Sequence, residues 1–185
     1  FRVEQGETVT LAGRTGAGKS TIFKLILGLY SPQQGSVTIF GAPADQISDR
    51  QKRRLFGYVE QTLRPASGTA GDQISLFDET ITADQIAHAV WLVGLDSVIA
   101  QLPQGMATPW DPALFSQGQL QLLAIARAVA ADPRILLLDE ITANLDSGTE
   151  ALVMEALLRA SANRTVISIS HRLYQHNRNG RLISI

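Results

Sequence analysis

With 185 residues, 45% of them hydrophobic and 18% charged, the chain has the composition of one globular domain with a sizeable core. Its formal net charge of -1 argues against a polyanionic partner, because nucleic-acid binders usually carry a basic excess on one face. The sequence has no cysteine, which excludes disulfides and cysteine-ligated zinc, and no apolar run of the roughly 18 residues that span a membrane. Because Phe1 is not a methionine, we expect the chain to be part of a longer polypeptide.

The segment 13–20, GRTGAGKS, lies between an apolar strand predicted at 7–12 and an apolar helix predicted at 21–29. It fits the phosphate-binding pattern GxxxxGK[ST] in the strand, loop and helix context that the pattern requires. Glycines let backbone N–H groups turn toward a polyphosphate, and the helix N-terminus adds partial positive charge. Lys19 suits the β- and γ-phosphates, and the Ser20 hydroxyl suits Mg²⁺. The predicted nucleotide contacts here are Gly13, Arg14, Thr15, Gly16, Ala17, Gly18, Lys19, Ser20 and Thr21.

Strand and helix patterns alternate along the chain, which predicts an α/β fold with a largely parallel sheet. Buried strands are expected at 9–12, 134–138 and 165–170, and shorter strands at 36–40 and 56–60. From about 72 to 131 the pattern is mainly helical, with helices expected at 83–93, 97–102 and 117–130. We therefore expect a sheet core formed by 1–71 and 132–185, with 72–131 inserted as a helical subdomain. Trp91 is expected to pack in the core, and Trp110 to anchor a loop.

The strand predicted at 134–138 ends in two adjacent acids, Asp139 and Glu140. At the carboxyl end of a parallel strand, such acids lie where ligands bind in sheets of this kind. Asp139 is suited to hold Mg²⁺, and Glu140 to polarise a water aligned on the γ-phosphate. The pair therefore extends the prediction from nucleotide binding to nucleotide hydrolysis.

Further motifs resemble those of ATP-binding cassette (ABC) ATPases, in the order that this family shows. Residues 115–119, FSQGQ, resemble the signature LSGGQ, and 124–128, AIARA, resemble the segment that usually follows it. Gln61 matches the Q-loop, 144–146 (NLD) the D-loop, and His171 the switch histidine. The resemblance covers nearly the whole chain. It implies a P-loop NTPase with a RecA-like parallel sheet core and an inserted α-helical subdomain.

The resemblance also implies roles for single residues. In ABC ATPases two domains pair head to tail, so that the signature of one covers the ATP held by the P-loop of the other. Glu140, His171 and Gln61 would be catalytic, while Ser20, Gln61 and Asp139 would hold Mg²⁺. Ser116, Gly118, Gln119 and Asp146 would contact the ATP of the second domain. The implied cofactors are ATP and Mg²⁺.

Segments at 67–69 (SGT) with 72–74 after it, at 102–105 (LPQG) and at 171–173 (HRL) look like the exporter branch of the family. They imply the motor domain of an ABC exporter, powered by ATP-driven dimerisation. The implied partners are an exporter transmembrane domain, in the same chain or a separate subunit, and a second nucleotide-binding domain in a homodimer or heterodimer. Nucleic acid is not among them. The implied location is the cytoplasmic face of the inner or plasma membrane, where the transmembrane partner would hold the domain.

Some features depart from the family pattern. The adenine-stacking aromatic residue should precede Phe1, and Gln117 stands where the signature has glycine. PWDPA at 109–113 replaces the usual glycine- and glutamate-bearing loop that touches the transmembrane domain. Asn179 and Gly180 read as a hairpin turn before a strand at 181–183, yet no strand precedes them. We therefore expect residues to be missing near 174–178, by deletion or by omission of a loop.

The sequence leaves other functions open. A small-molecule P-loop kinase shares the first motif but does not need the signature, and an ABC protein acting on the ribosome would need two cassettes. An ABC-type ATPase of DNA repair or chromosome organisation shares the nucleotide motifs, but it usually carries a long coiled-coil or zinc insertion that this chain lacks. A regulatory cassette without hydrolysis is disfavoured by the intact Lys19, Asp139, Glu140 and His171. The exporter ATPase is therefore favoured, with the DNA-repair type as the main alternative.

Overall fold

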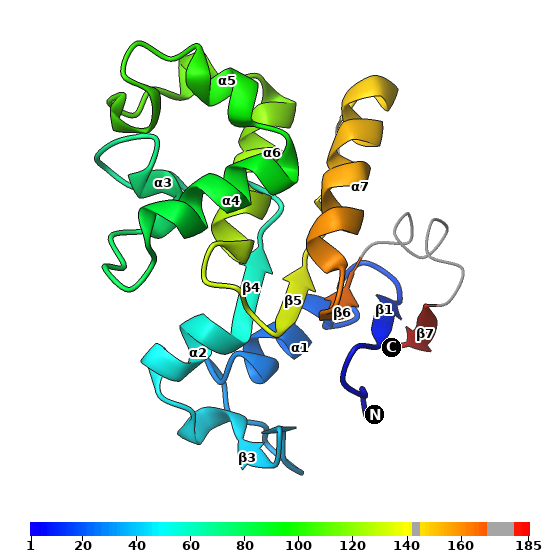
Figure 1. Cartoon of the computed structure of the whole chain (residues 1–185). Helices are drawn as coiled ribbons and strands as arrows, with labels where there is room; N and C mark the ends of the chain where they lie inside the picture. Colours follow the sequence, from blue (N-terminus) through cyan, green and yellow to red (C-terminus); the bar gives the residue numbers. More distant parts are fainter. Residues whose placement is uncertain (142–144, 170–179) are drawn as a thin grey trace.

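The computed structural model describes residues 1–141, 145–169 and 180–185 and places a parallel sheet at the centre of the chain (Figure 1). The sheet is five-stranded, in the order β4-β5-β6-β1-β7, and every neighbouring pair is parallel. Its strands are β1 (Thr8–Ala12), β4 (Phe56–Val59), β5 (Ile135–Leu138), β6 (Thr165–Ser168) and β7 (Arg181–Ser184). This confirms the predicted α/β fold. It also places the carboxyl ends of all these strands along one edge, where ligands bind in such sheets.

Helices cover both faces of the sheet. The helix α1 (Lys19–Ile26) follows β1 after one loop, and α2 (Asp49–Leu55) precedes β4. At the upper left of Figure 1 lie α3 (Asp72–Ser75), α4 (Ala83–Val93), α5 (Asp96–Ala100) and α6 (Gln117–Val129), and α7 (Ser147–Ser161) packs against α4 and α6. The remaining described elements are a hairpin of β2 (Thr38–Ile39) and β3 (Ala42–Pro43) and 3-10 turns at Ala44–Gln46, Gly105–Ala107 and Pro112–Leu114.

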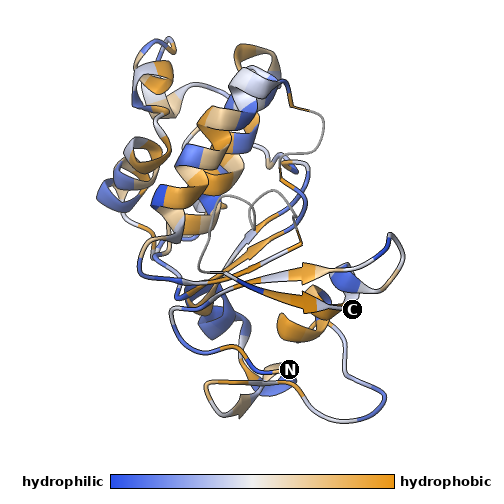
Figure 2. Ribbon diagram, turned by 90° about the vertical axis from the view of Figure 1, so that its right-hand side faces the viewer, coloured by the Kyte–Doolittle hydropathy of each residue, from blue (hydrophilic) through white to orange (hydrophobic). Residues whose placement is uncertain are grey.

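Alternating side chains along the strands build a core on each face of the sheet. In β5, Leu136 and Leu138 join the core formed with α4, α6 and α7, whereas Ile135 and Leu137 join the core that contains Phe23 of α1. Figure 2 shows the hydrophobic strands between these two sets of helices. A strand buried on both faces needs apolar side chains throughout, which is why 135–138 reads as a continuous apolar run.

The last strand differs from the prediction. Instead of forming a hairpin with a preceding strand, β7 pairs in parallel with β1, from Val9 opposite Arg181 to Ala12 opposite Ser184. The sequence did not indicate this pairing, in which β1 lies between β6 and β7. The gap expected near 174–178 lies outside the described residues.

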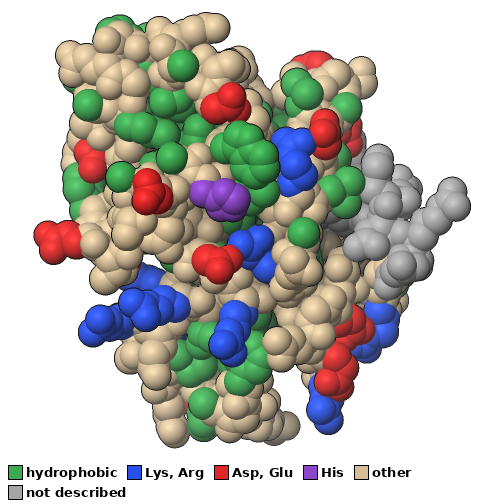
Figure 3. All heavy atoms as spheres, in the orientation of Figure 1, with side chains coloured by type: hydrophobic (Ala, Val, Ile, Leu, Met, Phe, Trp, Pro, Cys, Tyr) green, Lys and Arg blue, Asp and Glu red, His purple; other side chains and the backbone are tan. Residues whose placement is uncertain are grey.

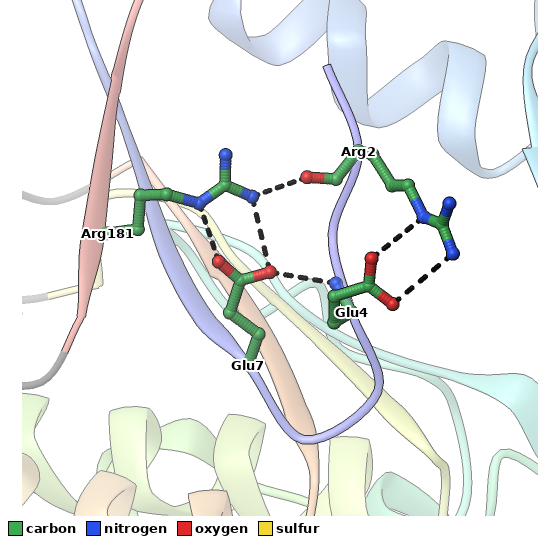
Figure 4. A network of polar contacts seen from close by, with 4 residues as sticks. All are labelled: Arg2, Glu4, Glu7 and Arg181. Carbon is green, nitrogen blue, oxygen red and sulfur yellow. Dashed lines mark hydrogen bonds and ion pairs between the residues drawn. The ribbon is translucent and has the colours of Figure 1, made fainter.

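Charged side chains hold β7 against the beginning of the chain (Figure 4). Arg181 donates to the two carboxylate oxygens of Glu7, at 2.6 and 3.2 Å, and also to the backbone carbonyl of Arg2. The backbone N–H of Glu4 donates to Glu7 at 2.8 Å. The bonds from Arg181, and then that from Glu4, lower the pKa of the Glu7 carboxyl. The network fastens β7 to β1 at the end of the sheet opposite the P-loop.

The two tryptophans have different environments. Trp110 anchors its loop as predicted, with its ring stacked on Phe115 at a centroid distance of 5.3 Å and its backbone N–H bonded to the carbonyl of Gly68 at 2.8 Å. Trp91 is 63% exposed and stacks on His88. The prediction that Trp91 packs in the core was therefore wrong, because α4 turns another of its faces inward.

Candidate active site

The loop between β1 and α1 has the backbone of a phosphate cradle. Gly16 and Gly18 adopt positive φ angles of 84° and 92°, which side-chain-bearing residues rarely adopt. Gly18 caps α1 without a side-chain acceptor, so the cap leaves the first N–H groups of the helix available to an anion. Gly13 begins the loop in a tight space, since a Cβ there would lie 2.9 Å from the carbonyl oxygen of Ile185. Glycine is therefore needed at both ends of the loop: Gly13 allows the close approach of Ile185 after β7, and Gly16 and Gly18 allow the turn into α1.

Lys19, the first residue of α1, reaches back over this loop. Its ammonium group donates to the carbonyl of Gly13 at 2.9 Å and to that of Arg14 at 3.1 Å. The charge is thereby held beside the N-terminus of α1, where the helix dipole already favours an anion. Loop, helix end and lysine together make a site suited to phosphate.

The loop borders a cavity of about 370 Å³ at the carboxyl edge of the sheet. Its walls come from the P-loop and from the residues that follow β4, β5 and β6. They are Thr15, Gly16, Gly18, Lys19, Ser20, Thr21, Gln61, Asp139, Glu140 and Ile169. Gly13, Arg14 and Ala17 belong to the same loop without lining the cavity. Residues singled out by separate motifs thus meet at one place, as hydrolysis of a bound nucleotide requires.

The two acids of this cavity have different surroundings. Burial raises the pKa of Asp139, and the negative charge of Glu140 raises it further, while the hydrogen bond from Tyr58 and the charge of Lys19 act in the opposite direction. Glu140 is exposed, and its backbone has a positive φ of 42°. This conformation is uncommon for a residue with a side chain, and strained backbone of this kind is concentrated at functional sites.

Gln61 lines the cavity while its backbone is attached to α6. The side-chain amide of Gln121 donates to the carbonyl of Gln61 at 2.8 Å. Further along α6, Arg127 donates to the carbonyl of Arg64 at 2.8 Å and to that of Gln73 at 2.5 Å. The segment after Gln61 is therefore held by two side chains of the signature helix. Sequence reasoning missed both, although they lie in the stretch that resembles the family just after its signature.

Residues of the signature and of the D-loop cap two helices. Ser116 caps α6: its hydroxyl accepts from the N–H of Gln119 at 3.3 Å, and the Gln119 side chain accepts from the N–H of Ser116 at 2.8 Å. Gly118 is buried against α7, where a Cβ would lie 2.2 Å from Cγ2 of Thr149. Asp146 caps α7 by accepting from the N–H groups of the second and third helical residues at 3.1 and 3.0 Å.

The signature does not share the cavity of the P-loop in its own chain. Ser116, Gly118, Gln119 and Asp146 are all described, and none of them lines that cavity. Ser116 is exposed, as is Gln117 after it. His171 and Asn144 lie outside the described residues, so their roles stay predictions.

The donors around the cavity suit Mg²⁺. Ser20, Gln61 and Asp139 offer a hydroxyl, an amide and a carboxylate, the oxygen donors that a hard divalent cation takes. Within 1–141, 145–169 and 180–185, no three or more His, Cys, Asp or Glu residues gather as a metal site.

Comparison with known proteins agrees with the site. A family model described as ABC transporter matches residues 1–143. A probable multidrug resistance ABC transporter ATP-binding/permease protein of Bacillus subtilis is 41% identical over 175 residues, which are 94% of this chain and 26% of that protein. An ATP-dependent lipid A-core flippase of Pseudoalteromonas atlantica is 38% identical over 176 residues, 94% of this chain and 30% of that protein.

A solved structure of a bacterial Atm1-family ABC exporter with ATP bound matches with a TM-score of 0.84 and 32% identity, covering 100% of this chain and 33% of that one. The chain thus spans between 26% and 33% of the length of these relatives. In the part of the chain that the structure describes, no helix has the length and apolar character of a membrane span. With the P-loop, the paired acids and the signature helix in the family's order, the chain belongs to the ABC transporter family, as an ATP-binding ATPase domain.

Proposed function

We propose that the chain is the ATP-driven motor domain of an exporter. The observation that carries the proposal is the gathering of Lys19, Gln61, Asp139 and Glu140 in one cavity, in a domain whose relatives include exporters. Those relatives are a multidrug transporter, a lipid flippase and an exporter. They favour export over DNA repair or chromosome organisation.

Each residue of the cavity has a separate task in the proposed reaction. Lys19 and the loop N–H groups bind the β- and γ-phosphates, and Glu140 accepts the proton of the attacking water. Gln61 orients that water, and His171 donates a hydrogen bond to the γ-phosphate. Ser20, Asp139 and Gln61 hold Mg²⁺, which neutralises charge that develops on the phosphate oxygens.

The other half of the site is assigned to a second nucleotide-binding domain. Ser116 is exposed at the beginning of α6, and the signature lies outside the P-loop cavity of its own chain. A head-to-tail pair would place Ser116, Gly118, Gln119 and Asp146 of one domain over the nucleotide held by the other. ATP bound between the domains stabilises the pair, and hydrolysis removes that stabilisation.

A groove of about 400 Å³ is suited to the transmembrane partner. It lies between α2, β4, α3 and α6, with apolar walls that include Leu63, Ile74 and Ile81. Two ion pairs lie among its lining residues, Arg53 with Asp78 at 3.5 Å and Arg64 with Glu60 at 3.2 Å. Figure 3 shows Lys and Arg side chains gathered over α2, which borders this groove. We assign the groove to an apolar segment of the membrane domain, which would hold the motor on the cytoplasmic face. In this assignment the groove separates the core (1–71 and 132–185) from the helical subdomain (72–131).

The test is the ATP-dependent association of the Glu140→Gln variant. Removal of a general base typically slows catalysis by about 10²- to 10⁴-fold, so the ATP-bound pair should persist. Light scattering should show the mass of the domain doubling with Mg·ATP and not without it. In the same background, Lys19→Ala should abolish the doubling and Ser116→Ala should weaken it.

A matched control separates the signature contact from helix capping. Ser48 makes the same capping box at the N-terminus of α2 as Ser116 makes on α6. Ser48→Ala should therefore leave the doubling unchanged. Two results would contradict the proposed pairing. One is a Glu140→Gln domain that binds Mg·ATP and stays monomeric, and the other is a domain whose mass doubles without nucleotide.

A further inference from the structure

Tyr58, the third residue of β4, contacts α1, which carries the predicted Mg²⁺ donor Ser20, and the carboxylate of Asp139, another predicted donor. Its ring meets Phe23 of α1 edge-on, with centroids 6.0 Å apart and planes at 86°. Its hydroxyl donates to Oδ2 of Asp139 at 3.2 Å. Tyr58 lies outside the lining of the nucleotide cavity and lines the groove between α2 and α6 instead, and no role is predicted for it from the sequence.

The contact with Phe23 relates Tyr58 to Ser20, another of the three predicted metal donors. Ser20 and Phe23 are three residues apart on α1, so they lie on the same side of the helix, one turn apart. Phe23 is 1% exposed and therefore presents a fixed surface to the ring of Tyr58. Because β4 and β5 are paired with Tyr58 opposite Leu137, the phenol needs to reach only a short way along the sheet to Asp139. Tyr58 thus contacts the helix that carries Ser20 and the carboxylate of Asp139.

This hydrogen bond has a consequence for metal binding. A carboxylate has two oxygens, and the phenol of Tyr58 engages Oδ2 of Asp139. Carboxylates that bind metals are themselves commonly held by hydrogen bonds, and these bonds orient the ligand.

We propose that Tyr58 is a positioning residue for the magnesium ion: its hydroxyl fixes one carboxylate oxygen of Asp139 and leaves the other for the cation, at a spacing from Ser20 that Phe23 maintains. This inference rests on the motor function proposed above. Because Tyr58 does not line the nucleotide cavity, loss of its hydroxyl should reduce the extent to which Mg²⁺ strengthens ATP binding. The affinity for ATP in the absence of Mg²⁺ should be unchanged.

The test is Tyr58→Phe in the full-length protein that carries this domain, in a Glu140→Gln background that prevents turnover. The variant keeps the ring on Phe23 and removes only the hydroxyl. Dissociation constants of a fluorescent ATP analogue are measured in EDTA and in excess Mg²⁺, and their ratio reports how much the cation strengthens binding. Loss of a group that orients a metal ligand typically costs 10- to 100-fold in metal affinity, so we expect the ratio to fall about 10-fold. The constant in EDTA should be unchanged.

Two controls isolate the hydroxyl. Tyr30 is 52% exposed and lies under Lys24 of α1, so Tyr30→Phe should leave both dissociation constants unchanged. In an Asp139→Asn background, Tyr58→Phe should cause no further fall in the ratio, because the carboxylate that it orients is gone. Both controls keep the tyrosine ring in place.

The outcomes distinguish the two proposals. An unchanged ratio in Tyr58→Phe, beside a normal effect of Mg²⁺ in the parent, would overturn the positioning role and leave the motor function standing. Equal weakening with and without Mg²⁺ would also overturn it, since that result indicates a general distortion of the site. A parent protein that binds no ATP under either condition would overturn the motor function itself.

Discussion

Replacement of Gly118 by alanine tests how the signature helix is seated on α7. A Cβ at position 118 lies 2.2 Å from Cγ2 of Thr149, whereas carbon atoms in contact stay about 3.5 to 4.0 Å apart. The helices α6 and α7 must therefore separate by roughly 1 Å or more, or Thr149 must rotate. The backbone N–H of Thr149 donates to Asp146, the residue that caps α7, at 3.0 Å, so the backbone of Thr149 is held in place.

We expect Gly118→Ala to lower the free energy of unfolding by about 1 to 2 kcal/mol. Overpacking of a tight contact costs about 1 to 3 kcal/mol, and the better helix propensity of alanine recovers up to about 1 kcal/mol. Gly118 does not have a positive φ, so no backbone strain is added. Denaturant unfolding measures the change directly. In thermal unfolding, a domain of this size should lose about 2 to 4 °C in Tm per kcal/mol.

A second substitution identifies the clashing atom. Thr149→Ser removes the methyl group and keeps the hydroxyl, so it should restore about 1 kcal/mol to the Gly118→Ala variant through a favourable coupling. Gly148→Ala is the matched control on α7, because a Cβ there would meet Oδ1 of Asp146 at an ordinary 3.4 Å. If Gly118→Ala is as stable as the parent, or if Thr149→Ser does not rescue it, the helix is not seated in this way.

Other contacts give expectations of their own. Arg127→Leu should lower the free energy of unfolding by about 1 to 3 kcal/mol, because it removes charge-assisted hydrogen bonds to two backbone carbonyls. Denaturant unfolding measures this change, and an unchanged midpoint would contradict the expectation. Gly13→Ala should weaken ATP binding, because the new Cβ would lie 2.9 Å from the carbonyl oxygen of Ile185 and displace the loop. Binding is measured by fluorescence, and an unchanged affinity would refute the close approach. Arg181 lowers the pKa of Glu7 from 4.5, so the ion pair stabilises the fold above that pH and is lost as the pH falls through the lowered value. Glu7→Gln should therefore differ from the parent at neutral pH and converge with it in acid, in unfolding curves measured across pH.

The central strands were predictable because their signal is local. Residues 135–138 are continuously apolar, and the glycines of the P-loop mark the end of β1. The helices α2 and α7 were not predicted, although their caps are visible in the sequence. Ser48 and Gln51 form a capping box at α2, and Asp146 caps α7. No residue of α2 is buried, so this helix has no apolar face for a periodicity argument to detect.

The errors arose where a local pattern does not identify its partner. The turn signal before Arg181 could not indicate that β7 pairs with β1, which is far away in the sequence. Helix α4 is apolar on more than one side, and packing against α6 and α7 buries the side with Val90 and Val93, leaving Trp91 outside. The signature motif likewise predicted a ligand contact for Gly118 but could not indicate its packing against another helix.

The attachment of α6 joins the nucleotide cavity to the signature. Gln121 on this helix binds the backbone carbonyl of Gln61, which lines the cavity, while Ser116 forms the exposed end of the same helix. Gln121 lies about one and a half turns from Ser116, a distance over which a helix is a rigid element. The hydrogen bond to Gln61 therefore links the backbone at the nucleotide cavity directly to the helix whose first turn carries the signature.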